Sequence, residues 1–211
     1  FLYYPGTRVA DAYLCGDPSN LTDDEQKLYE IASEFIKSNL ADEMPLLYKE
    51  KLIHDFVAQS TEYFDEESEE NIPRFCSAIG VFLDGKSNCQ GYTDAFYMLG
   101  TMAGLHVERM SGITDGPHSW NVIELDGQWY VVDVTWNDLP ATENGNALHD
   151  YLEYTYFNIG VDLLSTHAWK ADYERFALAK KTDNQYFYYH NNAPVFGTYA
   201  QPYEELVSYS V

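Results

Sequence analysis

The chain has 211 residues, and its 34 acidic against 12 basic side chains give a formal net charge of −22. This balance makes nucleic acid and anionic membrane surfaces poor partners, because affinity for both depends on cationic contacts. The hydrophobic fraction of 45% is that of an ordinary globular protein, and no apolar run has the length of a membrane span. We predict one domain over residues 1–211, with its core at about 22–170 and peripheral extensions at 1–21 and 171–211.

The N-terminal part predicts two helices after an irregular segment that covers residues 1–19. Thr22-Asp23-Asp24-Glu25 is a capping box, which typically opens a helix, and a second helix is expected from about Pro45. The run from Glu62 to Glu70 then carries six acids in nine residues. It is predicted to be a solvated loop, and the alternative of calcium binding lacks the ligand spacing of an EF-hand.

The segment Gly85-Lys86-Ser87-Asn88-Cys89-Gln90-Gly91-Tyr92 predicts a thiol at the start of a helix. Gly85 suits a turn, and Asn88 is placed to cap the helix. Apolar residues then recur at three- and four-residue intervals, so that one face is expected to be buried, until Gly104 ends the helix. The positive end of a helix stabilises a thiolate, so Cys89 is placed where a cysteine becomes nucleophilic.

Residues 118–136 predict a β-hairpin around Asp126-Gly127, following a strand over 106–113. A two-residue turn puts Leu125 opposite Gln128 and, by continuation, His118 opposite Thr135 and Trp120 opposite Asp133. His118 and Asp133 then become diagonal neighbours on one face, roughly 7–8 Å apart. A carboxylate inside an apolar strand needs a donor, and the imidazole N–H of His118 is the expected one.

Cys89, His118 and Asp133 together form a candidate catalytic triad. The thiol would attack a carbonyl carbon, the imidazole would hold and return the proton, and the carboxylate would fix the imidazole tautomer. Three alternatives stay open. Cys89 could be an inert buried thiol; the three residues could bind a metal, although no second Cys or His has ligand-like spacing; or Asp133 could cap a turn, a role that does not suit a strand interior.

These motifs, in this order, resemble the transglutaminase-like superfamily, a branch of the papain-like cysteine enzymes, and in particular its bacterial members. The resemblance is carried by Gly85 to Tyr92, by Gly112 with His118-Ser119-Trp120-Asn121, and by the run 129–138. The capping box and Tyr156-Phe157-Asn158 followed by His167 match it more loosely. It implies an α+β fold in which N-terminal helices and the nucleophile-bearing helix pack on an antiparallel sheet.

The resemblance also implies a thioester acyl-enzyme on Cys89 and no cofactor or metal. The Cys89 backbone N–H would be one oxyanion donor, and relatives use an upstream side chain as the second, for which Tyr63 is the candidate. Trp136 is expected to border the substrate cleft, although tryptophans are more often core residues. His167 has no assigned chemistry and is expected to be structural. Cys15 and Cys76 are expected to be unpaired thiols, and the alternative is a disulfide between them in an oxidising compartment.

The favoured function is hydrolysis of peptide or glutamine amide bonds, because no amine site is recognisable in the sequence. A transglutaminase that uses an amine acceptor is the alternative, and a non-catalytic surface module that binds peptide or glycan through its 19 tyrosines is a third. The expected partner is a protein or peptide, including cell-wall peptide. The acidity and the exported habit of many bacterial relatives favour a secreted or cell-surface location, in which this chain could be part of a longer surface protein.

Overall fold

The computed structural model describes residues 4–64, 72–139, 151–152, 154–160 and 166–169. Its elements, in chain order, are α1 (Pro5–Cys15), α2 (Asp23–Asn39), α3 (Leu46–Gln59), β1 (Glu62–Tyr63), α4 (Ile72–Phe75), the π-helical turn η1 (Gly80–Asp84), β2 (Lys86–Ser87), α5 (Cys89–Met102), β3 (His106–Ile113), β4 (Pro117–Leu125), β5 (Gln128–Val132), α6 (Val134–Asn137), β6 (Asp138–Leu139), β7 (Tyr151–Leu152) and β8 (Ala168–Trp169).

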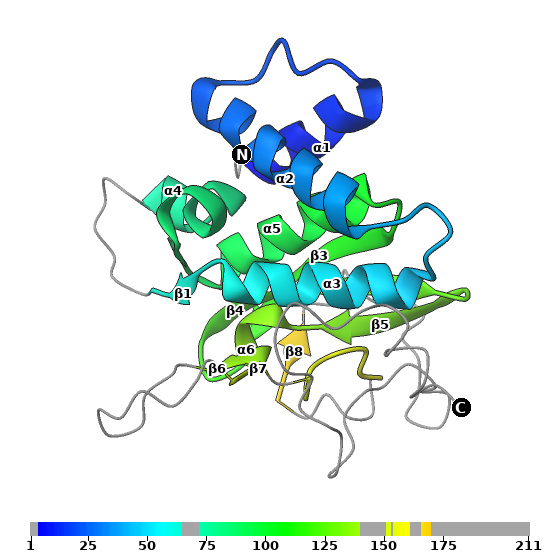
Figure 1. Cartoon of the computed structure of the whole chain (residues 1–211). Helices are drawn as coiled ribbons and strands as arrows, with labels where there is room; N and C mark the ends of the chain where they lie inside the picture. Colours follow the sequence, from blue (N-terminus) through cyan, green and yellow to red (C-terminus); the bar gives the residue numbers. More distant parts are fainter. Residues whose placement is uncertain (1–3, 65–71, 140–150, 153, 161–165, 170–211) are drawn as a thin grey trace.

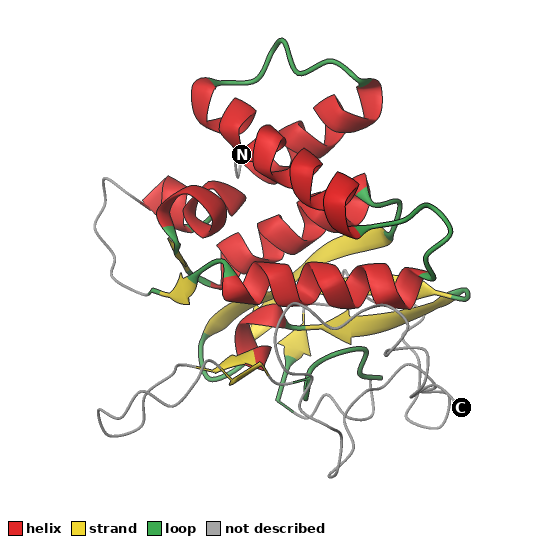
Figure 2. Ribbon diagram, viewed as in Figure 1, coloured by secondary structure: helices red, strands yellow, loops and turns green. Residues whose placement is uncertain are grey.

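A four-stranded antiparallel sheet in the order β5-β4-β3-β8 carries the helices on one side (Figure 1, Figure 2). Helix α5 is buried on most of its circumference rather than on one face only, because α1, α3 and the sheet all pack against it. The Asn121 side chain of β4 donates to the Thr93 carbonyl oxygen of α5 at 3.1 Å, which fixes helix against strand. This arrangement confirms the α+β fold with an antiparallel sheet.

Two hydrophobic clusters flank the sheet. The larger one joins the helices to Ile123 and Leu125 of β4, whereas the smaller one, on alternate positions of the same strand, contains Trp120 and Val122. Side chains alternate across a strand, so β4 divides its residues between the two clusters. His118 lies at the start of this strand, with the parity of Trp120.

The predicted hairpin turn is confirmed, and so is the register close to it. Asp126 and Gly127 have φ values of 51° and 77°, and Leu125 pairs with Gln128. The prediction that the second strand of the hairpin continues to residue 136 is wrong. Strand β5 ends at Val132, and the chain turns at once into the helical turn α6. Asp133 and Thr135 therefore have no partners in the ladder.

The N-terminal half differs from expectation at two places. The capping box at Thr22 opens α2 as predicted, but residues 5–15, expected to be irregular, form α1. This helix adds Val9 and Ala10 to the larger cluster, so it packs as part of the core. The first two residues of the expected acidic loop form β1, and residues 65–70, with the calcium alternative, lie outside the described part.

Residues 171–211 lie outside the described part of the chain, and the domain limits therefore stay predictions. No helix in the described ranges combines the length and apolar character that crossing a bilayer requires.

Candidate active site

Cys89 is the first residue of α5, and its position is fixed from the residues before it. Asn88 caps the helix, since its side chain accepts from the Gln90 N–H at 3.1 Å and its own N–H donates to the Phe75 carbonyl oxygen at 3.2 Å. The Cys89 residue is partly exposed. The thiol therefore sits at the positive end of a long helix with access to solvent.

Close backbone packing keeps the start of α5 in place. A Cβ atom added to Gly91 would lie 1.7 Å from Ser87 Oγ and within 2.9 Å of the carbonyl oxygens of Phe75 and Ser77. The Ser87 hydroxyl donates to the Phe75 carbonyl oxygen at 2.5 Å. Only glycine fits at this point, one turn into the helix that carries Cys89.

His118 lies between the thiol and the carboxylate. Its Nε2 is 2.7 Å from Asp133 Oδ2, and its other nitrogen, Nδ1, is the one left to face Cys89. Burial opposes charging of the imidazole, and it is the largest single influence on the pKa of His118. Hydrogen bonds and charge interactions with Asp133 and Cys89 outweigh it and raise the pKa of His118 to about 9. The ring is thus held as a proton carrier between the two groups.

Asp133 reaches His118 as the N-cap of α6 and not as a strand residue. Its Oδ1 accepts from the Trp136 N–H at 3.1 Å, and its Oδ2 accepts from His118 and, at 2.9 Å, from His167 Nε2. The residue is completely buried. Burial alone would raise the pKa of Asp133, but the donors outweigh burial and lower it. The predicted pairing of Asp133 with His118 is present. The prediction that Asp133 does not cap a turn is wrong, because the same carboxylate binds His118 and caps α6.

A second buried network of hydrogen bonds holds α6 against α3. Asn137 Oδ1 accepts from the Tyr156 N–H at 2.8 Å, and its Nδ2 is 3.0 Å from His54 Nε2. His54 Nδ1 lies 3.0 Å from Asp55 Oδ1. Burial lowers the pKa of His54, so it acts as a neutral bridge between α3 and α6.

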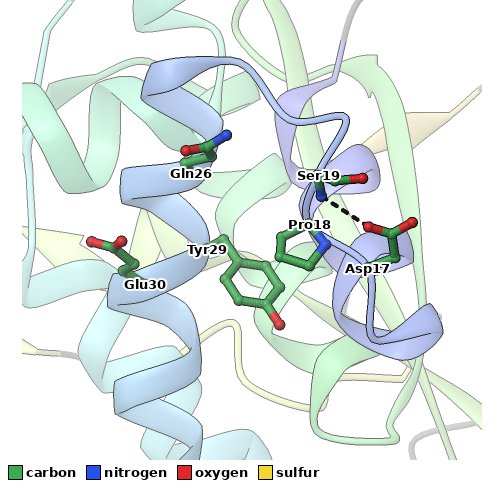
Figure 3. A pocket seen from close by; sticks show the side chains of 6 residues that line it. All are labelled: Asp17, Pro18, Ser19, Gln26, Tyr29 and Glu30. Carbon is green, nitrogen blue, oxygen red and sulfur yellow. Dashed lines mark hydrogen bonds between the residues drawn. The ribbon is translucent and has the colours of Figure 1, made fainter.

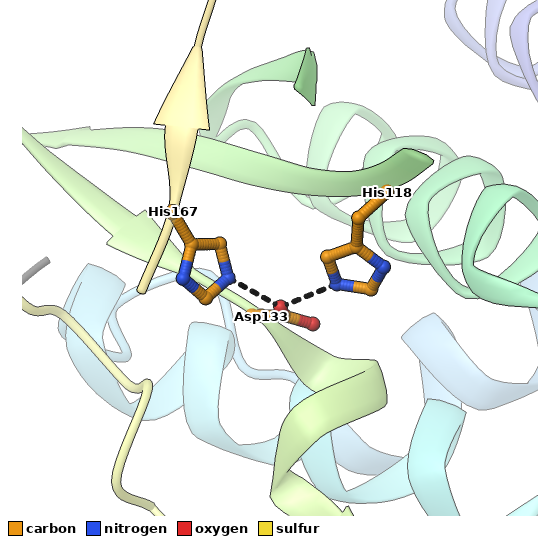
Figure 4. Close-up of side chains that lie close together, drawn as sticks. All are labelled: His118, Asp133 and His167. Carbon is orange, nitrogen blue, oxygen red and sulfur yellow. Dashed lines mark hydrogen bonds and ion pairs between the residues drawn. The ribbon is translucent and has the colours of Figure 1, made fainter. Parts of the chain in front are cut away.

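His167, which matches the family loosely and is expected to be structural, also lies at this site. Figure 4 shows its ring and that of His118 pointing at the same carboxylate. It comes 34 residues after Asp133 in the chain, and no local pattern predicts the contact. Trp136 is brought to the same place, with its ring centroid 5.6 Å from that of His118 and 4.7 Å from that of His167.

Tyr63 lies beside the strand that leads to the thiol. It pairs with Ser87 in the parallel β1–β2 ladder and is 48% exposed. Tyr63 is therefore the ladder partner of a residue that comes two positions before Cys89 in the chain. The assignment of Tyr63 as an oxyanion donor stays a prediction. Cys15 is exposed and Cys76 is partly buried, and both are free thiols as expected.

His118, Asp133 and His167 offer three atoms of metal-ligand type within 4.8 Å of one another. Two ligands of one tetrahedral ion, each bonded at about 2.1 Å, would lie roughly 3.4 Å apart. The observed separations of 2.7 and 2.9 Å to a single oxygen fit hydrogen bonds better. The geometry thus favours a hydrogen-bonded cluster over a metal centre.

A separate pocket of about 330 Å³ lies between the end of α1 and the start of α2 (Figure 3). Its lining residues are Asp17, Pro18, Ser19, Gln26, Tyr29 and Glu30. None of them belongs to the cluster around Cys89, and the pocket shows no convergent group that would indicate a reaction.

Comparison with known proteins finds curated relatives and solved structures of low sequence identity. The kyphoscoliosis peptidase of Mus musculus is 25% identical over 122 residues, and the human protein is 24% identical over the same length. Each match covers 52% of this chain but 18% of the relative, so the chain spans less than a fifth of their length. The crystal structure of a TGase is similar with a TM-score of 0.45 and 16% identity, over 68% of this chain and 41% of that one.

The family comparison covers the last part of α2, all of α3, the thiol, the histidine and the aspartate. The transglutaminase-like superfamily matches residues 29–134, which is half of the chain and includes Cys89, His118 and Asp133. The chain belongs to the transglutaminase-like superfamily.

Proposed function

We propose that this protein is a cysteine-dependent amide acyl-transfer enzyme that most readily hydrolyses peptide or glutamine amide bonds. The observation that carries the proposal is the position of His118, whose Nε2 is 2.7 Å from a buried carboxylate and whose pKa is raised by interactions with both Asp133 and Cys89. An imidazole held in this way can take the thiol proton and later return it to a leaving amine.

In the first half-reaction the Cys89 sulfur forms a bond to the amide carbonyl carbon. The carbon–nitrogen bond then breaks, the amine leaves with a proton from the His118 imidazolium, and a thioester remains on the sulfur. Asp133, which stays ionised, stabilises the imidazolium. The Cys89 backbone N–H and the Tyr63 hydroxyl are the proposed donors to the oxyanion.

In the second half-reaction His118 accepts a proton from the nucleophile that attacks the thioester. Water as acceptor gives hydrolysis, and a primary amine gives transamidation. We favour water because the relatives matched above are named peptidases. A protein or peptide substrate is proposed on the same ground, and a cell-wall peptide and a secreted or surface location remain predictions.

The test uses a peptide-like thiol electrophile on the Cys15→Ser variant, which removes the exposed competing thiol. We expect a single adduct, located on Cys89 by peptide mass spectrometry, and no adduct in the double variant with Cys89→Ala. A peptide library, incubated with and without a primary amine, then separates hydrolysis from transamidation. Absence of labelling at neutral pH, together with full biological effect of Cys89→Ala, would favour a binding module instead.

A further inference from the structure

His167 contacts the carboxylate of the proposed triad, yet the mechanism above does not use it. Its side chain has no exposed surface, and its Nε2 lies 2.9 Å from Asp133 Oδ2, the same oxygen that His118 binds at 2.7 Å. A buried imidazole far from any charge would be an ordinary core residue. His167 instead shares a carboxylate oxygen with His118, the proposed catalytic base.

The partners of His167 select its tautomer. Its Nδ1 lies 2.9 Å from Thr166 Oγ1, a hydroxyl that can donate. With Nδ1 accepting from Thr166, the ring proton of the neutral imidazole is on Nε2, which then donates to Asp133. Both histidines therefore present an N–H to one carboxylate, and the carboxylate receives a third donor from the Trp136 backbone.

The fold delivers His167 to this point through the sheet. Trp169 of β8 pairs with Gly112 of β3, and Gly112 pairs in turn with His118 of β4. The residues that precede Trp169 are thereby brought alongside the start of β4, where His118 lies. The position of His167 depends on this edge strand and not on sequence proximity.

Aromatic rings enclose the imidazole on several sides. Its centroid is 4.7 Å from Trp120, edge to face, 4.7 Å from Trp136 and 5.3 Å from Tyr156. These rings exclude water and leave Asp133 as the acceptor for the His167 N–H. They also hold the ring plane, which fixes the direction of the hydrogen bond.

We propose that His167 is a positioning residue, which orients the Asp133 carboxylate toward His118 and helps to keep it ionised within a fully buried site. This inference rests on the proposed function for its catalytic meaning, whereas the hydrogen-bonded chain Thr166–His167–Asp133–His118 can be tested without turnover. Among the described residues, the titratable groups that face the carboxylate are His118 from β4, His167 before β8 and His54 from α3. The Asp133 charge acts on His54 by raising its pKa, against the larger effect of burial.

Two matched variants separate orientation from packing. His167→Phe keeps an aromatic ring of similar size but has no donor, whereas His167→Gln keeps an N–H near the position of Nε2. We expect His167→Phe to slow acyl transfer or Cys89 labelling about 10- to 100-fold, the value of a hydrogen bond to a charged group. The KM should change little, the thermal midpoint should stay close to that of the unmodified protein, and His167→Gln should recover most of the rate.

The pH dependence gives the readout that a merely structural role would not move. In His167→Phe the carboxylate is less firmly held, so the alkaline limb of the rate, which reports loss of the His118 proton, should shift to lower pH. Imidazole ¹⁵N NMR of the unmodified protein should show a proton on Nε2 of both His167 and His118.

Three results would overturn the inference. The first is a His167→Phe variant with unchanged rate and pH profile. The second is a folded His167→Gln variant that is as slow as His167→Phe. The third is one equivalent of tightly held metal in the purified protein, because an ion would then organise the three groups. If the NMR pattern is found but the unmodified protein does not label at Cys89, the proposed function fails and the positioning of His118 through His167 and Asp133 stands.

Discussion

Glu50 of α3 is a fully buried carboxyl, and we expect its proton to control how stability depends on pH. Its Oε2 accepts a hydrogen bond from Asn158 Nδ2 at 2.9 Å. Its Oε1 and Asn158 Oδ1 are buried without a partner among the described residues. Burial, which the Asn158 bond offsets only in part, raises the pKa of Glu50 from 4.5 to about 8. A carboxylic acid has the donor that this pair lacks, so the neutral form suits the site.

The magnitude follows from the two pKa values. A raised pKa means that the native state holds the proton more tightly than the unfolded chain does. The stability gained from this proton is complete below pH 4.5 and is lost as the pH rises through about 8. At about 1.4 kcal/mol per pKa unit, the difference between 4.5 and about 8 amounts to on the order of 5 kcal/mol of unfolding free energy.

The assay compares urea unfolding of the unmodified protein and Glu50→Gln from about pH 5 to about pH 9. The amide keeps the shape of the side chain and cannot ionise. We expect the two proteins to have similar stability near pH 5, and the variant to become more stable by several kcal/mol near pH 9. Taking the difference cancels the contributions of the titratable groups that both proteins share, including Asp94 and His54. A difference that does not change with pH would refute the reasoning, because Glu50 would then titrate alike in both states.

Three further predictions concern the site and the helices that hold it. Asp133→Asn should slow acyl transfer roughly 10²- to 10⁴-fold in steady-state kinetics, since the amide cannot stabilise the imidazolium; a rate near that of the unmodified protein would remove Asp133 from the mechanism. Gly91→Ala should lower stability by about 1–3 kcal/mol and slow Cys89 labelling, because the carbonyl oxygens of Phe75 and Ser77 cannot rotate away. Gly116→Ala, where an added Cβ meets nothing within 4 Å, is its control, and equal effects of the two would contradict the packing argument. Thr22→Ala should reduce the free energy of unfolding by about 1 kcal/mol through loss of the α2 capping box, with Thr22→Ser close to the unmodified protein, as measured by denaturant titration.

Local signals in the sequence predict the elements that carry the thiol and the histidine. The Asn88 cap, the Asp126-Gly127 turn and the Gly104 stop each act within a few residues, so their outcomes can be read from sequence alone. Helix α1 carries signals of the same kind, since Pro5 is in its first turn and Gly16 ends it with a φ of 69°. The first turn has no acidic residue, and this makes the helix harder to predict from sequence.

The junction at Asp133 shows where pattern reasoning fails. The β-branched and aromatic residues around Asp133 predict a strand through residue 136. Asp133 is also a strong N-cap, however, and its carboxylate accepts from the Trp136 N–H as the chain leaves the sheet. The contact between His118 and Asp133 is predicted correctly although its backbone geometry is not. The contact with His167 depends on the pairing of β8 with β3, a tertiary relation that no short pattern encodes.

The most direct test of the central claim is to trap the acyl-enzyme. An activated peptide ester is mixed with the Cys15→Ser protein, the reaction is quenched in acid, and the modified peptide is identified by mass spectrometry. We expect one acyl group per molecule, as a thioester on Cys89 that forms in a burst and forms far more slowly in His118→Ala. Acyl groups spread over Cys76 and other nucleophiles, or acylation of Cys89 at the same rate without the imidazole, would contradict it.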